Sequence, residues 1–170
     1  MGMPSDEVEE IRQAGMLHDI GKIGIPDFIL YKPALLTAEE FEIMKTHSVK
    51  GQKILEPLQV GAMQRICHMV RNHHEMFDGR GYPDKLEGEQ IPLGARILAV
   101  ADCFDTMVSK RAYKTVRSYE EAFAELRRYS GTQFDPKIVE AFLESLRTYG
   151  DPRTRPPLEE EDMPIGEMVG

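Results

Sequence analysis

The chain has 170 residues and carries 21 Lys and Arg against 29 Asp and Glu, a net charge of −8. This length suits one compact domain with its own core, and the lack of an apolar run of about 18 residues excludes a spanning helix from this segment. The acidic charge argues against a general surface for DNA or RNA.

Taken in chain order, the apolar residues recur at helical spacing, and no stretch alternates for long enough to predict a strand. Thr37-Ala38-Glu39-Glu40 and Ser118-Tyr119-Glu120-Glu121 are capping-box patterns that open helices. Asp135-Pro136 is an N-cap followed by proline at the first helical position. We therefore predict an all-α fold, a compact helical bundle with helices over 6–18, from Thr37 toward Met44, over 48–56, 61–75 and 93–109, from Ser118 to a stop at Gly131, and from Asp135 to about Gly150.

One long segment, from Met76 to Pro92, has no helical periodicity and contains five glycines and prolines. A loop of this length in a compact helical domain is usually functional or mobile. After Gly150 the composition turns to proline and acidic residues. We therefore expect a single domain over 1–150 and a poorly ordered acidic tail over 151–170.

The two cysteines, Cys67 and Cys103, fit neither a disulfide framework nor a CxxC metal spacing. We interpret them as reduced thiols, which are typical of cytoplasmic proteins. The N-terminus does not resemble a signal peptide. The expected location is the cytoplasm.

Four of the five histidines stand in polar contexts beside carboxylates or glycines, and His68 is left out as an ordinary surface residue. Each of the others alone could be a helix cap or a salt-bridge partner. Together they indicate a metal centre, because helical bundles build such centres from imidazoles and carboxylates that project inward from several helices. Asp19 could bridge two metals, and this ligand set suits Fe, Mn or Zn. The candidate ligands are His18, Asp19, His47, His73, His74 and Asp102.

These residues lie in an ordered series of motifs. His18-Asp19-Ile20-Gly21-Lys22 resembles the HD and GK motif of the HD-GYP domains, a subgroup of the HD phosphohydrolase superfamily. The run from His73 to Pro83 resembles the second signature of that family and includes Gly81-Tyr82-Pro83. The runs from Ile91 to Tyr113 and from Gly131 to Pro136 also look like the family, so the resemblance covers about 11–146.

The resemblance implies an all-helical HD-type bundle with a long GYP loop, which hydrolyses the bacterial second messenger cyclic di-GMP to pGpG or GMP through a metal-bridged hydroxide. It implies two or three divalent metal ions, with iron or manganese expected. The six candidate ligands match the family's ligands, and Asp19 would be the bridging one. Lys22 would lie near the scissile phosphate, Tyr82 would line the substrate site, and Arg111 and Lys114 would hold phosphate or guanine.

The residues themselves add two observations. Lys110, Arg111, Lys114 and Arg117 form a dense basic cluster in an acidic chain, although such a cluster can also be a plain solvated face. Asp105 lies one helical turn from Asp102 on the same face, where it would orient the substrate or a neighbouring group, or else form an ordinary salt bridge.

The chain departs from the family at its start. The family places a further helix with a histidine ligand before the HD motif, whereas only 17 residues precede His18 here and none is a histidine. We expect one metal position to lack a ligand, while the position served by Asp19, His47, His73 and His74 is complete. We also expect an uncovered apolar surface that a second copy of the chain could bury in a homodimer.

The sequence also permits two other hypotheses about function. In one, the domain is catalytically impaired and binds cyclic di-GMP or a signalling partner in a two-component or second-messenger pathway, as the missing ligand suggests. In the other, the chain is an HD hydrolase for another nucleotide, which would leave the GYP loop unexplained. The partners expected by resemblance are an upstream receiver or sensor domain and a diguanylate cyclase (GGDEF) domain.

Overall fold

The computed structural model describes residues 2–58, 61–109 and 117–151. Helices dominate these residues and no strand forms among them, which confirms the predicted all-α class. None of the described helices is both long and apolar enough to cross a membrane. The elements are α1 (Ser5–Leu17), η1 (Ile20–Gly24), α2 (Asp27–Leu30), α3 (Ala38–Lys45), α4 (His47–Leu55), η2 (Glu56–Leu58), α5 (Ala62–Asn72), η3 (Gly88–Gln90), α6 (Leu93–Val108), α7 (Tyr119–Arg128) and α8 (Pro136–Tyr149).

Three helices begin where the capping patterns predict. The side chains of Thr37 and Ser118 each accept a hydrogen bond from the backbone three residues on, and the glutamate there bonds back to the cap. Asp135 accepts from the backbone N–H of Lys137 at 2.8 Å, with proline at the first helical position. These caps satisfy N–H groups that a helix start leaves without intrahelical partners.

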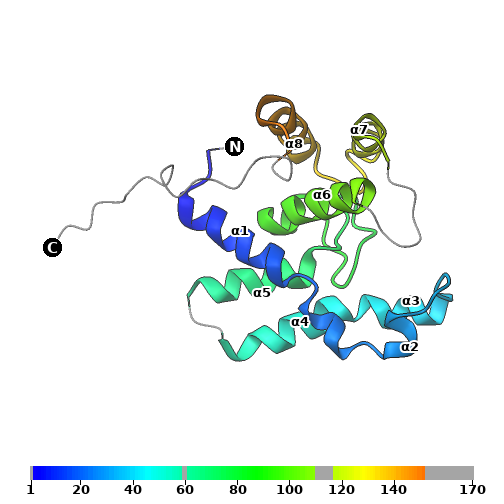
Figure 1. Cartoon of the computed structure of the whole chain (residues 1–170). Coiled ribbons are helices and arrows are strands. Elements are labelled where there is room, and N and C mark those ends of the chain that lie inside the picture. Colours follow the sequence, from blue (N-terminus) through cyan, green and yellow to red (C-terminus); the bar gives the residue numbers. More distant parts are fainter. Residues whose placement is uncertain (1, 59–60, 110–116, 152–170) are drawn as a thin grey trace, which may run out of the picture.

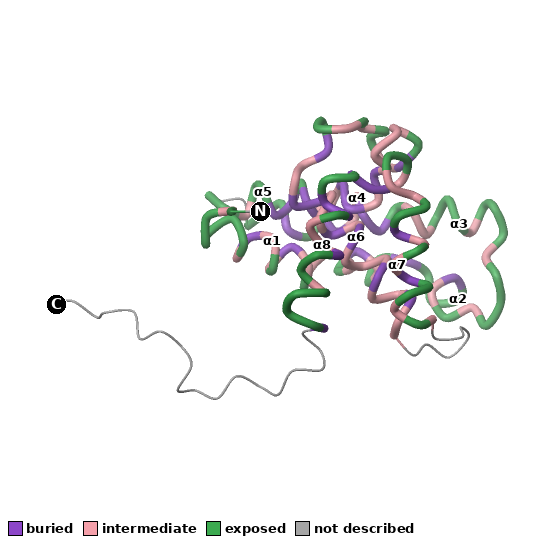
Figure 2. The backbone as a smooth tube through the Cα atoms, turned by 90° about the horizontal axis from the view of Figure 1, so that it is seen from above, coloured by how far each residue is buried: buried purple, intermediate pink, exposed green. Residues whose placement is uncertain are grey.

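Helix α6 lies in the middle of the fold and contributes to two apolar clusters (Figure 1). Its Leu98 packs with residues of α1, α4 and α5, whereas Val100, Phe104 and Met107 pack with α7 and α8. Figure 2 shows buried residues concentrated along α4, α5 and α6, while α3 is largely exposed. Helix α6 is therefore the central helix, which packs against α1, α4 and α5 on one side and against α7 and α8 on the other.

Helix α5 is shorter than predicted, because it ends at Asn72 and not at residue 75. In a continuing helix the backbone N–H of His74 would bond to the carbonyl oxygen of Val70. Here the ring Nδ1 of His73 lies 2.7 Å from that oxygen. A side chain thus takes the bond that the next turn would need, and the helix stops. The short elements η1, α2 and η3 are further features that hydrophobic periodicity did not predict.

The long loop over 76–92 is confirmed as irregular apart from η3. It is tied to the turn before α8, because the backbone N–H groups of Phe77 and Asp78 donate to the carbonyls of Gln133 and Thr132 at 3.2 and 2.9 Å. The predicted tail lies outside the described residues, except for Asp151. That residue is buried and accepts a hydrogen bond from the Tyr119 hydroxyl.

Candidate metal site

The predicted ligands come together from four separate parts of the chain, and three of the histidines follow directly on helix ends. His18 is the C-cap of α1, and His73 is the C-cap of α5. His47 begins α4, two residues after α3 ends. Asp102 comes from the middle of α6. Apart from Asp102, the site is therefore built from residues at or next to helix ends.

Each of these three histidines is oriented by the helix that it follows. The Nδ1 atoms of His18, His47 and His73 lie 2.6, 2.8 and 2.7 Å from the carbonyl oxygen three residues earlier. A carbonyl oxygen can only accept, so Nδ1 must carry the proton. The neutral ring then presents an unprotonated Nε2, which is the atom that binds a metal.

The unprotonated nitrogens face one another. The Nε2 atoms of His47 and His73 are 3.4 Å apart, and candidate ligand atoms of His47, His73 and His74 all lie within 4.8 Å of one another. Two acceptors at that distance make no hydrogen bond to each other. A shared cation satisfies them, so this donor set fits a divalent metal ion.

Asp19 lies between two groups of candidate ligands. Its Oδ1 is 3.5 Å from Nε2 of His47, and its Oδ2 is 3.5 Å from Nε2 of His18. Nε2 of His18 is in turn 3.8 Å from Oδ1 of Asp102. One carboxylate thus faces two positions, as the predicted bridging role requires.

The electrostatics keep the three imidazoles of His47, His73 and His74 neutral and Asp19 ionised. Burial lowers the pKa of His73 to about 4 and that of His74 to about 2, and it also lowers the pKa of His47. Burial opposes the ionisation of Asp19, but the hydrogen bond and charge of Lys22 outweigh it and the pKa is lowered. Neutral imidazoles and an ionised carboxylate are the forms that bind metals.

Lys22 and Asp102 each lie beside another candidate site residue. The Nζ of Lys22 is 2.6 Å from Oδ2 of Asp19 within the η1 turn. Asp102 stands in an apolar stretch of the sequence, yet 39% of its side chain is exposed and its partner is His18. Asp102 is therefore a partly solvated carboxylate that lies beside His18, where it can serve as a ligand.

Two glycines allow η1, which directly follows His18 and Asp19, to pack closely against α4. A Cβ on Gly21 would overlap with the carbonyl oxygen of His47 and the backbone nitrogen of Gly51. A Cβ on Gly51 would lie 2.9 Å from a methyl carbon of Val70 on α5. The backbones of η1, α4 and α5 therefore approach more closely than side chains would allow, and this approach places Asp19 beside His47.

A cavity of about 360 Å³ opens beside these histidines. The ring of Tyr82 stacks on that of His74, with centroids 4.9 Å apart and planes inclined by 29°. The Nζ of Lys45 lies 5.6 Å from the Tyr82 centroid and 5.0 Å from that of Phe41. The cavity is lined by Phe41, His73, His74, Glu75, Met76, Tyr82, Ala99, Asp102, Cys103, Thr106, Met107 and Gln133.

The remaining predicted residues divide into two groups. Asp105 lies with Asp102 and His18 around a smaller cavity of about 250 Å³, and its carboxylate accepts from the Ser109 hydroxyl at 2.8 Å. Arg111 and Lys114 lie outside the described residues. Cys67 and Cys103 are not joined in a disulfide, in agreement with the prediction.

Sequence reasoning assigned no role to Glu75, Phe41 or Lys45, all of which lie at or beside the cavity. Glu75 is only 3% exposed, and its neighbours His73 and His74 were the available signal. Lys45 and Phe41 carried no such signal, because a lysine and an aromatic residue four apart on a helix are ordinary surface features.

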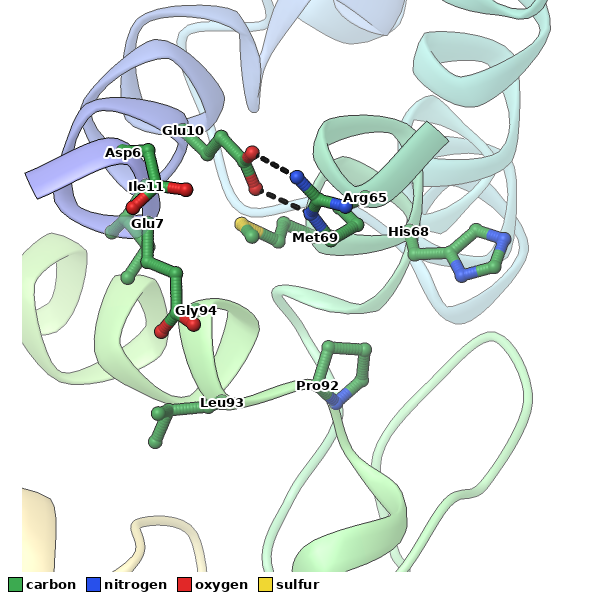
Figure 3. A pocket seen from close by; sticks show the side chains of 10 residues that line it. All are labelled: Asp6, Glu7, Glu10, Ile11, Arg65, His68, Met69, Pro92, Leu93 and Gly94. Carbon is green, nitrogen blue, oxygen red and sulfur yellow. Dashed lines mark hydrogen bonds and ion pairs between the residues drawn. The ribbon is translucent and has the colours of Figure 1, made fainter. Parts of the chain in front are cut away.

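A larger cavity of about 450 Å³ lies between α1, α5 and the start of α6, and none of the predicted ligands lines it (Figure 3). Its acidic wall includes Glu10, which pairs through both carboxylate oxygens with Arg65. His68 is exposed and its ring points away from this wall, consistent with its exclusion from the ligand set.

The sequence matches a family described as HD domain over residues 1–138. It is 51% identical over 143 residues to a cyclic di-GMP phosphodiesterase of Thermotoga maritima and 46% identical over 143 residues to the cyclic di-GMP phosphodiesterase response regulator RpfG of Xanthomonas campestris. It is 43% identical over 143 residues to the 3'3'-cGAMP-specific phosphodiesterase 2 of Vibrio cholerae. Each match covers 84% of this chain but only 39%, 38% and 27% of the relative, so the chain spans less than two-fifths of their length.

A solved structure of a cyclic GMP-AMP-specific phosphodiesterase from V. cholerae has a similar fold. The TM-score is 0.64 at 22% identity, and the match covers 89% of this chain and 40% of the other. At this identity the similarity concerns the fold alone.

Proposed function

The chain belongs to the HD domain family, as a domain of the HD-GYP type, and on that premise we propose that it is a metal-dependent phosphodiesterase that hydrolyses cyclic di-GMP to pGpG or GMP. The observation that carries this proposal is the convergence of four histidines and Asp102 around Asp19. The names of the relatives support the cyclic dinucleotide as the class of substrate.

One metal would be held by His47, His73, His74 and Asp19, and another by His18, Asp102 and Asp19. When bound, divalent metals supply a nucleophilic water at neutral pH and neutralise charge on the phosphate. Fe and Mn are the metals that we expect from the resemblance to the HD-GYP domains, and imidazole and carboxylate ligands suit Fe, Mn and Zn alike.

The protein's own groups would position the substrate. Hydrolysis breaks a bond between phosphorus and a ribose oxygen, and negative charge develops on that oxygen as it leaves. Lys22, 2.6 Å from Asp19, would place a positive charge at this point. Tyr82 would offer its ring to a guanine base, since base stacking on an aromatic ring contributes about 1–3 kcal/mol. Arg111 and Lys114 would hold the second phosphate or base.

Hydrolysis of cyclic di-GMP by the purified chain, supplied with Mn²⁺ or with Fe²⁺ under reducing conditions, tests the proposal. We expect turnover with the unmodified chain and with His68→Ala, and none with His73→Ala. Equal rates for His73→Ala and the unmodified chain would overturn the assignment of the site. Metal content measured on the same samples separates loss of metal from loss of substrate handling.

A second candidate substrate is 3'3'-cGAMP, because a relative at 43% identity carries that name. The two dinucleotides share a phosphodiester ring and one guanine and differ at the other base. The ratio of kcat/KM for the two substrates, measured on one preparation, decides between them.

A further inference from the structure

We propose that Glu75 is a positioning residue, whose buried carboxylate holds the segment after Pro83 and thereby keeps the Tyr82 ring stacked against His74. This inference rests on the proposed function for its consequence in catalysis. Its structural part concerns one backbone hydrogen bond and can be tested without any turnover.

The buried carboxylate of Glu75 faces the backbone amides of the segment that follows Pro83. Its Oε1 accepts from the backbone N–H of Asp84 at 2.6 Å. Its Oε2 is buried and makes no hydrogen bond within the described part of the chain. Glu75 is 3% exposed and its side chain is oriented toward this amide, so the Asp84 N–H loses its acceptor when the carboxylate is removed.

The loop that contains Tyr82 also contacts the backbone of His74 directly. The backbone N–H of Tyr82 donates to the carbonyl of His74 at 3.3 Å. A Cβ on Gly81 would overlap with the backbone of Glu75 and Met76, so the loop backbone lies directly on the chain that follows the histidines. Tyr82 therefore lies between two anchors, close packing at Gly81 on one side and the Glu75 hydrogen bond at Asp84 on the other.

The same segment is also clamped to α5. The side chain of Asp84 accepts two hydrogen bonds from Arg71, at 2.7 and 2.6 Å, and one from Asn72 at 2.8 Å. Arg71 and Asn72 directly precede His73. The Asp84 side chain thus fixes where the segment lies, while the Glu75 contact fixes how its backbone is turned and hence where the preceding Tyr82 ring points.

Gln is the replacement closest in shape to Glu75. Glu75→Gln keeps an oxygen for the Asp84 amide at the same side-chain length. Glu75→Met has a similar length but offers only a weak acceptor in its thioether. The two variants therefore differ mainly in the hydrogen bond.

Amide hydrogen exchange of the unmodified chain is the first measurement. We expect the Asp84 amide to be protected, to exchange at least about tenfold faster in Glu75→Met, and to regain protection in Glu75→Gln. An unprotected Asp84 amide in the unmodified chain would overturn the inference, whether or not any variant folds.

Kinetics are the second measurement. We expect Glu75→Met to raise KM for the cyclic dinucleotide about tenfold, with the metal content unchanged and a smaller effect on kcat, and Glu75→Gln to restore most of the affinity. Glu89→Ala is the control, because Glu89 lies in the same loop with 76% of its side chain exposed. Equal KM values for Glu75→Met and Glu89→Ala would refute the role in catalysis. An inactive unmodified chain would instead count against the proposed function.

Discussion

Gly21 lies so close to the backbone of His47 that no side chain fits between the two residues. Because Gly21 is two positions from Asp19 in a tight turn, this contact sets the distance between the bridging carboxylate and the imidazole. A substitution at Gly21 tests this contact.

Gly21→Ala should destabilise the fold and separate Asp19 from His47, because the added methyl group meets backbone atoms that cannot rotate away. Overpacking of this kind costs about 1–3 kcal/mol, measured here as the free energy of unfolding in urea. Gly24→Ala in the same turn is the control, since a Cβ there would meet only the flexible side chain of Lys50. Equal losses in the two variants would contradict the prediction.

Added Mn²⁺ should raise the melting temperature of the unmodified chain, because an ion that binds only the folded state stabilises it. At a hundredfold excess over Kd the gain is about 2.7 kcal/mol, or roughly 5–10 °C. His47→Ala should show a much smaller shift, and His68→Ala the full one. A full shift in His47→Ala would mean that the ion binds elsewhere.

Asp135 should be among the most sensitive polar positions. One of its oxygens caps α8 and the other accepts from Arg96 at 2.5 Å, where the side chains of Asp135 and Arg96 are 4% and 12% exposed. Asp135→Ala leaves a largely buried guanidinium without its partner, at a cost of about 3–5 kcal/mol. Asp135→Asn retains an acceptor for Arg96 and should lose less stability than Asp135→Ala. Urea unfolding of both variants measures their loss of stability. Ser118→Ala, which removes a helix cap alone, is the control and should lose about 1 kcal/mol.

The Glu10 carboxylate should make stability depend on pH. Its hydrogen bond to Arg65 lowers its pKa below the ordinary 4.5. A group whose pKa falls on folding stabilises the fold above its unfolded pKa, and this contribution is lost as the pH falls through the folded pKa. Glu10→Gln should therefore be less stable at pH 7, by up to about 1 kcal/mol for a pair whose arginine is exposed.

The stability difference between the unmodified chain and Glu10→Gln should shrink as the pH is lowered from about 5 to about 3. Unfolding curves across this range provide the measurement. Arg65→Gln should lose the same pH-dependent part. A difference that stays constant down to pH 3 would show that the pair adds no charge-dependent stability.

The helices could be predicted to within a few residues because local signals set their starts. Thr37, Ser118 and Asp135 each cap the helix that the sequence predicts. The end of α5 could not be predicted, since it depends on the ring of His73 turning back on Val70. Helical periodicity contains no information about such a competing side-chain bond.

The candidate ligands could be identified from residue type and motif, but their arrangement could not. That the two oxygens of Asp19 face different histidines depends on how η1 packs against α4. Glu75 was missed for a related reason. Its partner is a backbone amide nine residues away, and a backbone amide has no signature in sequence.

The histidines that turn back on their own helices also make helix length part of the site. Inserting or deleting one residue within α1 or α5 would rotate the ring that follows by about 100° and shift it by about 1.5 Å relative to the start of that helix. The ring would then move away from the other candidate ligands even though every ligand was still present. We therefore expect these helices to tolerate substitutions on their exposed faces far better than any change in their number of residues.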